Sequence, residues 1–384
     1  MNAARAHSWV AHLREGGTTP WLAWLASAPE TAPETAPSGR LPGAQQLELL
    51  RRINLVAGSG AQSRRRYGRG LADRVLAAPA AGRGKTDLPL VGLDPPGFGP
   101  PPVDPSDLSA HELLRVASVL LADDLVALGA DPVPASWARP WRRRFRLVGD
   151  PVVVGALRAD LLGRGRPEGG PRPFLVAVGG PLDDVLAHTW TQRCFETGTK
   201  PWSQWLRFWR ERDQLPARAD LLACVARWNA RRPLVRIVTD VERLPAELGV
   251  RRLPEVRVPG ADQAELARRV AAVVGLRVPA AERPGLMRTL QQRIPDSGAA
   301  PVGVPPGEHD WVVASAERMS RGLSRAGYRV VGDLADLAPR AASAATSTGS
   351  VDDRQVLDLA IRMVVEPGWR DGGRAQVVER QVTQ

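Results

Sequence analysis

The segment Arg144–Asp150, RFRLVGD, decides how this sequence is interpreted. Its apolar run ends at Gly149, which is typical of a buried strand that closes in a sharp turn, and the residues from Pro151 onward have the pattern of a helix. Many α/β proteins bind a phosphate group at such a junction of strand, turn and helix. Here the turn Gly149-Asp150-Pro151 contains one acidic residue and no lysine, serine or threonine. The sequence therefore predicts the architecture of a nucleotide-binding fold without the residues that would bind the nucleotide.

Short apolar runs alternate with helical patterns through the middle of the chain. We expect buried strands at 145–148, 174–178 and 234–239, a fourth strand at 256–258, and helices between them. This alternation is typical of a parallel sheet covered by helices. The predicted fold class is α/β, with a small, mostly parallel sheet, helices on both faces, and a helical N-terminal region before it.

Proline-rich and small polar stretches suggest how the chain is divided, because such stretches do not form regular structure. The predicted units are 1–28 (N-terminal helical segment), 29–42 (Pro-rich linker), 43–140 (helical region with a Pro/Gly-rich loop at 94–106), 144–340 (α/β domain), 341–350 (loose linker) and 351–384 (C-terminal helix and tail). The sequence does not predict where residues 1–140 lie relative to the sheet.

The net charge of the 384 residues is +11, which raises the question of a nucleic-acid partner. Only Lys85 and Lys200 of the 52 basic residues are lysines, a bias typical of a GC-rich genome that encodes arginine in place of lysine. A nucleic-acid-binding surface concentrates its charge on one element, whereas these arginines are spread along the chain. The sequence therefore favours no nucleic-acid partner.

The cysteines, the histidines and the apolar runs of the sequence exclude several other classes of protein. Cys194 and Cys224 form no CxxC pair, and the five histidines have no metal-ligand spacing, so we predict no metal site. No apolar run is long enough to span a membrane, and the first residues lack the apolar core of a secretory signal. We expect a cytoplasmic protein without a membrane partner, whose partner, if it has one, is another protein.

Two segments resemble the sulfotransferase-like family of actinobacteria. Trp202–Trp228 contains WLRFWRERDQLP and a helix that ends in ARW, ahead of the strand LVRIVTD. Glu308–Pro339, EHDWVVASAERMSRGLSRAGYRVVGDLADLAP, resembles the family's C-terminal helix and its G-D-L-x-x-L tail. The resemblance covers about half of the chain, mostly residues 144–365, and implies a sulfotransferase-like domain there.

The resemblance also implies two anchors for the donor 3′-phosphoadenylyl sulfate. The family has a lysine-containing loop after its first strand and an arginine after a later strand. This chain has Gly149-Asp150-Pro151 at the first place and Gly179-Gly180-Pro181, without an arginine, at the second. We therefore predict no cofactor, and the degenerate loop binds the donor only if Arg142, Arg143 and Arg144 compensate for the missing cations.

A sulfotransferase further needs a general base that takes the proton from the hydroxyl acceptor. His188 and Glu196, which follow the second strand, are the candidate catalytic residues. The alternative for His188 is a partly exposed surface histidine with no role in chemistry.

These observations lead to three hypotheses about function. A phosphosulfate group needs hydrogen-bond donors and cations, and this chain offers Asp150 instead, so we expect a non-catalytic or diverged sulfotransferase-like protein with an accessory or interaction role. One alternative is an active sulfotransferase that transfers sulfate from 3′-phosphoadenylyl sulfate to a hydroxyl acceptor through an atypical donor site. The other is a basic protein- or nucleic-acid-interaction module.

Overall fold

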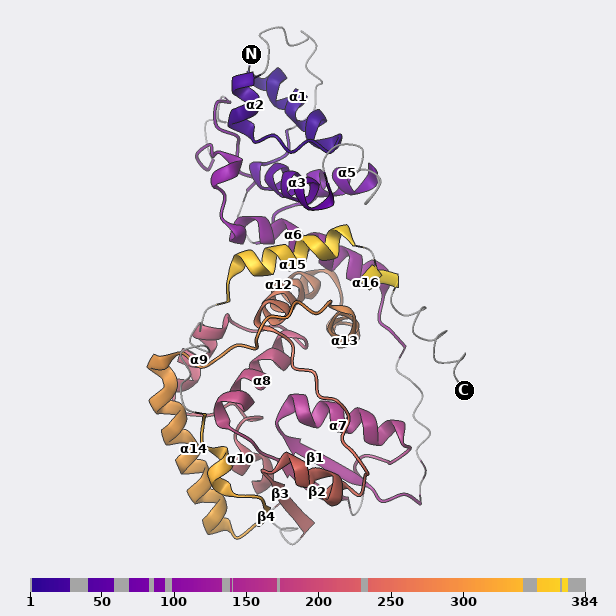
Figure 1. Ribbon diagram of the computed structural model, residues 1–384, viewed down its shortest axis with the longest axis vertical. Coiled ribbons are helices and arrows are strands. Elements are labelled where there is room, and N and C mark those ends of the chain that lie inside the picture. Colours follow the sequence, from indigo (N-terminus) through magenta and orange to yellow (C-terminus); the bar gives the residue numbers. More distant parts are fainter. Residues whose placement is uncertain are drawn as a thin grey trace.

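The computed structural model consists of a narrow N-terminal lobe, a middle layer of helices and a wider part that contains the sheet (Figure 1). It describes residues 2–27, 41–58, 69–82, 86–93, 99–132, 139, 141–170, 173–228, 234–340, 351–366 and 368–371. The predicted linker at 29–42 lies mostly outside the described residues, and the one at 341–350 lies entirely outside them.

Four parallel strands form the sheet in the order β1-β2-β3-β4. They are β1 (Phe145–Gly149), β2 (Phe174–Val178), β3 (Val235–Val238) and β4 (Arg329–Val331). The register pairs Phe145 with Phe174 at one end of β1 and Gly149 with Val178 at the other. Because all strands run in the same direction, their carboxyl ends lie together at one edge of the sheet.

The two faces of the sheet are covered by different helices. Helix α7 (Pro151–Gly163), which follows β1, packs Val154, Leu157 and Leu161 against one face, and α11 (Leu244–Leu248) joins the same apolar cluster. Helix α10 (Leu221–Ala226) packs on β1 and β2, where Leu221 and Val225 join the apolar cluster of the opposite face. The fold class predicted from the sequence, a small parallel sheet with helices on both faces, is confirmed.

The helical N-terminal region that the sequence predicts is present and forms the narrow lobe. Its elements are α1 (Asn2–Arg14), α2 (Trp21–Ser27), α3 (Ala44–Ala57), α5 (Arg69–Ala77), the 3-10 turn η1 (Pro105–Asp107) and α6 (Ala110–Leu128). The remaining helices are α8 (Leu182–Cys194), α9 (Trp202–Arg210), α12 (Ala261–Arg277), α13 (Arg283–Arg293), α14 (Pro306–Ala326), α15 (Asp353–Val365) and α16 (Gly368–Asp371), with 3-10 turns η3 (Val241–Arg243) and η4 (Leu334–Leu337).

The C-terminal helix α15 joins the lobe to the rest of the chain. It packs against α6, α12 and α3, so that segments from both ends of the chain lie side by side in the middle layer (Figure 1). Beside it, the buried carboxylate of Asp124 on α6 forms ion pairs with Arg74 of α5 and Arg370 of α16. One apolar cluster therefore continues from α1 to α16, across the boundaries that composition suggests.

One local prediction is wrong. No strand forms at 256–258, and the fourth strand is β4 instead. Pro254 and Pro259 enclose the short segment, and proline has no backbone N–H for a ladder.

The close approach of β1 to β2 requires a glycine at 149. Its φ is +105°, and a Cβ there would lie 2.0 Å from the carbonyl oxygen of Val178. We expect Gly149→Ala to lower the free energy of unfolding by about 2 kcal/mol or more, measured by urea denaturation.

Gly155→Ala is the matched control, because Gly155 lies inside α7 and a Cβ there meets nothing within 4 Å. This variant is expected to gain roughly 0.5 to 1 kcal/mol from helix propensity. Equal effects of the two substitutions would contradict the contact at Val178.

Candidate functional site

The candidate site lies at the carboxyl edge of the sheet, between the ends of β1 and β2. The chain leaves β1 into α7 on one face, whereas the connection from β2 to β3 brings α10 onto the other face. Diverging connections of this kind open a crevice outside the strand ends, which is where α/β folds bind ligands. This crevice contains the turn at Gly149 and Asp150, which the sequence predicts to follow the first strand.

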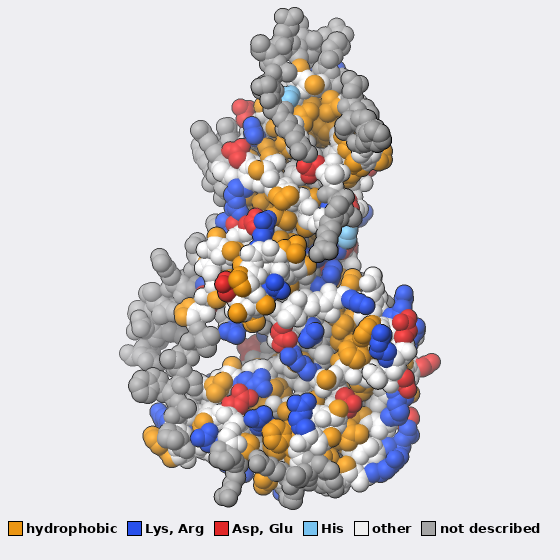
Figure 2. Space-filling view, turned by 180° about the vertical axis from the view of Figure 1, so that it is seen from behind, with side chains coloured by type: hydrophobic (Ala, Val, Ile, Leu, Met, Phe, Trp, Pro, Cys, Tyr) orange, Lys and Arg blue, Asp and Glu red, His pale blue; other side chains and the backbone are white. Residues whose placement is uncertain are grey.

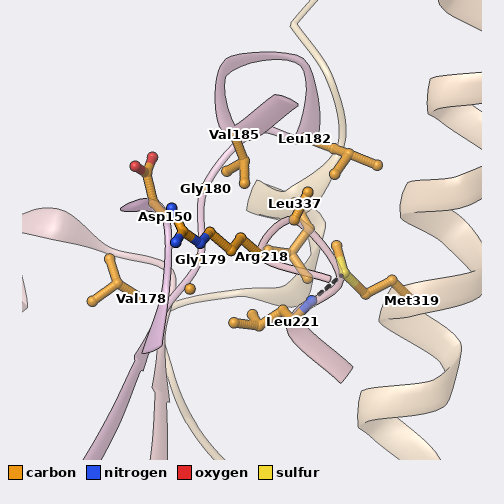
Figure 3. A pocket seen from close by; sticks show the side chains of 12 residues that line it. Asp150, Val178, Gly179, Gly180, Leu182, Val185, Arg218, Leu221, Met319 and Leu337 are labelled. Atoms are coloured by element: carbon orange, nitrogen blue, oxygen red, sulfur yellow. Dashed lines mark hydrogen bonds between the residues drawn. The ribbon is translucent and has the colours of Figure 1, made fainter. Parts of the chain in front are cut away.

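The pocket is small and mostly apolar. It is lined by Gly149, Asp150, Val178, Gly179, Gly180, Leu182, Val185, Arg218, Ala219, Leu221, Met319 and Leu337 (Figure 3). Its hollow holds about 220 Å³ including the part open to solvent, but the space that the centre of a water molecule can reach is about 10 Å³. That is close to the minimum for one water molecule, so in this conformation the pocket does not admit a nucleotide.

Asp150 is bound on both sides by the protein itself. One carboxylate oxygen, Oδ1, accepts hydrogen bonds from the backbone N–H groups of Val152 (3.0 Å) and Val153 (3.2 Å) and so caps the start of α7. The residue is 5% exposed. Pro151 at the first helical position has no N–H, so the amides that a phosphate would use at this helix end are already occupied or absent.

His188 on α8 lies against the other oxygen of the same carboxylate. Its Nδ1 is 2.6 Å from Oδ2 of Asp150, and the histidine is largely buried. A carboxylate on one ring nitrogen fixes the orientation of an imidazole, as in acid–base sites. The sequence suggests separate roles for these two residues, Asp150 in the loop after β1 and His188 as a general base. In the structure they form a single pair.

Arg218 brings one cation into the pocket from the loop between α9 and α10. Figure 3 shows its side chain extending across the pocket, whereas the Asp150 carboxylate points away from the apolar residues Leu221 and Met319. The guanidinium is half exposed and pairs with Glu196 at 2.8 Å. Glu196, the second candidate base, is therefore held at the rim by an ion pair.

Acidic groups at the start of α8 make this edge unfavourable for anions. Asp183 and Asp184 occupy the first turn of the helix. Burial and the neighbouring Asp183 raise the pKa of Asp184, although Arg340 lies 2.7 Å away. Ion pairs thus take up Arg218 and Arg340 within the site.

Cys224 lies beneath the turn and is not a nucleophile in this arrangement. Its thiol donates to the carbonyl oxygen of Ala217 at 3.1 Å, and burial raises its pKa. A nucleophilic cysteine needs a lowered pKa, because the thiolate is the reactive form. Cys194 is buried as well, and burial raises its pKa well above the usual value.

The arginines proposed to compensate for the missing cations lie elsewhere. Arg142, Arg143 and Arg144 precede β1, so they lie at the amino edge of the sheet. A strand of this length separates them from Gly149 by about 15 Å. The structure therefore brings together Gly149, Asp150, Pro151, His188 and Glu196, and it places the three arginines at the other end of the strand.

Two kinds of feature are absent from the part of the chain that is described. No cluster of three or more His, Cys, Asp or Glu side chains with metal-site geometry occurs among these residues. None of the described helices combines the length and the apolar character that a membrane span requires.

Sequence reasoning missed Arg218 and Met319, which line the pocket. Arg218 is one of many arginines and lies in a loop, so no spacing distinguishes it. Met319 lies on the buried face of α14, and its sulfur accepts a hydrogen bond from the backbone N–H of Leu221 at 3.3 Å. Only the fold shows that this face closes the pocket.

In comparisons with known proteins, no family model, no curated protein and no solved structure matches this chain.

The cap formed by Asp150 leads to a graded prediction. Asp150→Ala removes both amide contacts of α7 and is expected to cost about 1 to 2 kcal/mol of unfolding free energy. Asp150→Asn keeps a capping oxygen and is expected to cost less. Urea denaturation of both variants measures the difference, and an alanine variant as stable as the wild type would contradict the capping role.

The buried carboxyl of Asp184 leads to a prediction about pH. Its pKa is higher in the folded than in the unfolded chain, so its ionisation destabilises the fold as the pH rises through that range. We expect Asp184→Asn to increase the unfolding free energy at neutral pH by up to about 1 kcal/mol, and the gain to vanish below about pH 4.

Arg340→Ala is the control for this experiment, because Arg340 is mostly exposed and its pair with Asp184 contributes little. A loss of stability in Asp184→Asn at neutral pH would contradict the prediction. It would show that the ion pair with Arg340 stabilises the fold more than burial of the Asp184 charge destabilises it.

Proposed function

We propose that this chain is a cytoplasmic, diverged member of the actinobacterial sulfotransferase-like family, with an accessory or interaction role and no bound donor nucleotide. One observation carries the proposal: Asp150 occupies the N–H groups of Val152 and Val153 at the start of α7. A donor phosphate would have to displace a buried carboxylate that is also paired with His188. Removing that carboxylate from its partners would leave buried polar groups unpaired, which is costly.

The surroundings of this turn support the same function. The pocket has room for about one water molecule. The turn Gly179-Gly180-Pro181 contributes no cation, and Arg218 is engaged by Glu196. A doubly charged phosphosulfate would therefore meet Asp183 and Asp184 without a free cation from the turns of β1 and β2.

The second candidate function is an active sulfotransferase with an atypical donor site. It is favoured by the pair of His188 and Asp150, since an oriented histidine at the carboxyl edge is suited to take a proton from a hydroxyl group. Arg218 would then leave Glu196 and bind the donor.

Adenosine 3′,5′-bisphosphate, the product form of the donor, distinguishes the two functions. We expect no heat in isothermal titration calorimetry and no thermal stabilisation of the full chain. A ligand at about 100 times its dissociation constant would stabilise the fold by about 2.7 kcal/mol, which a thermal shift detects readily.

Stabilisation at micromolar ligand that is lost in Arg218→Ala would overturn the proposal and support the active transferase. Arg325→Ala is the matched control, because this arginine is exposed at the end of α14 and is not among the residues that line the pocket. It should leave any such binding unchanged.

A further inference from the structure

Six arginines gather at the amino edge of the sheet, opposite the pocket. We call this group the basic patch, and its members are Arg139, Arg142, Arg143, Arg144, Arg146 and Arg166. Four of them precede β1, Arg146 lies within β1, and Arg166 follows α7. In the rear view, basic side chains are more frequent on the part that contains the sheet than on the N-terminal lobe (Figure 2).

Direct contacts bring members of the basic patch together. The backbone N–H of Arg139 donates to the carbonyl oxygen of Gly165 at 2.9 Å, which joins the two segments. Arg143 and Arg166 both lie over the ring of Phe174, at 4.7 and 5.2 Å from its centroid. Burial and the nearby Arg143, Arg142 and Arg164 lower the pKa of Arg166, as expected where like charges crowd.

No carboxylate compensates this charge within the described chain. None of the six arginines of the basic patch takes part in an ion pair there. The acidic residues nearby are used by other arginines: Asp160 pairs with Arg164, and Glu168 pairs with Arg158. Crowded cations without acidic partners destabilise the isolated protein through self-repulsion, and a bound polyanion would remove that cost.

Trp141 projects from the same surface. It is 79% exposed, and it lies in a turn that is closed by a hydrogen bond from the N–H of Arg142 to the carbonyl oxygen of Arg139. The other described tryptophans are at least partly buried. An exposed indole between guanidinium groups offers a stacking surface next to phosphate-binding cations.

We propose that the basic patch and Trp141 bind single-stranded nucleic acid, with phosphates on the guanidinium groups and a base stacked on the indole. Along the sequence these arginines are dispersed, which by itself favours no nucleic-acid partner. The fold brings the segments around Arg142 and Arg166 together, so the concentration of charge that such binding needs exists in space.

A protein partner fits this surface less well. Stable protein interfaces have an apolar core that is fully removed from water, surrounded by a polar rim. Beside the basic patch, Trp141 is the one large apolar side chain that is exposed among the described residues, and its neighbours are charged. The proposal is independent of the function proposed above, because the basic patch and the pocket lie at opposite edges of the sheet.

Fluorescence anisotropy with a labelled single-stranded oligonucleotide of about 20 nucleotides tests the proposal on the full chain. We expect micromolar binding at about 50 mM salt that weakens steeply by about 200 mM. Trp141→Ala should weaken binding about 5-fold or more and leave its salt dependence nearly unchanged, because the lost contact is uncharged.

The double variant Arg142→Glu with Arg143→Glu should weaken binding about 10-fold or more. It should also reduce the slope of log affinity against log salt concentration by about 1 to 2, since each phosphate contact contributes about 0.7 to that slope. The matched control is Arg288→Glu with Arg354→Glu. Both residues are exposed, lie on α13 and α15 away from the sheet, and give the same change in net charge. Circular dichroism verifies that every variant is folded.

Three outcomes would overturn the proposal. These are absence of binding by the wild type at low salt, equal losses in the patch variant and the control, and wild-type affinity in Trp141→Ala. The last outcome, together with equal competition by polyglutamate, would identify the surface as a site for acidic polypeptides.

Discussion

The carboxylate of Asp150 connects three elements of the fold. It caps α7, its residue follows β1 directly, and it pairs with His188 on α8. The backbone N–H of Asp150 also donates to the carbonyl oxygen of Val178 at 3.0 Å, which ties the turn to the end of β2. Asp150 thus holds the carboxyl edge of the sheet together. Its carboxylate occupies the backbone N–H groups at the start of α7 that a phosphate ligand would otherwise bind.

The two edges of the sheet differ in charge. At the carboxyl edge, acidic side chains and their arginine partners surround a pocket with room for about one water molecule. At the amino edge, the basic patch has no acidic partners among the described residues. The usual ligand edge of an α/β fold is therefore closed in this conformation, and the uncompensated charge lies at the edge that such folds normally leave unused.

The sequence predicts the sheet well because buried parallel strands are continuous apolar runs, as at Phe174–Val178. It fails at 256–258, where a similar run is too short and is enclosed by prolines. For the site, the sequence identifies the turn at Asp150 and the candidate His188, but not that they form a pair. Their contact depends on the packing of α7 against α8, and the position of Arg218 depends on a loop, so neither follows from local spacing.

The packing of α15 against α6 and α3 has a consequence for the order in which this protein is made. The N-terminal helices leave the ribosome early, but the apolar face that covers α6 is encoded well over half a chain length later. Until then, the apolar residues of α6 lack part of their cover, and exposed apolar surface of this kind favours aggregation and chaperone binding. The lobe is thus synthesised before the sheet, but its core is complete only after α15 has been made.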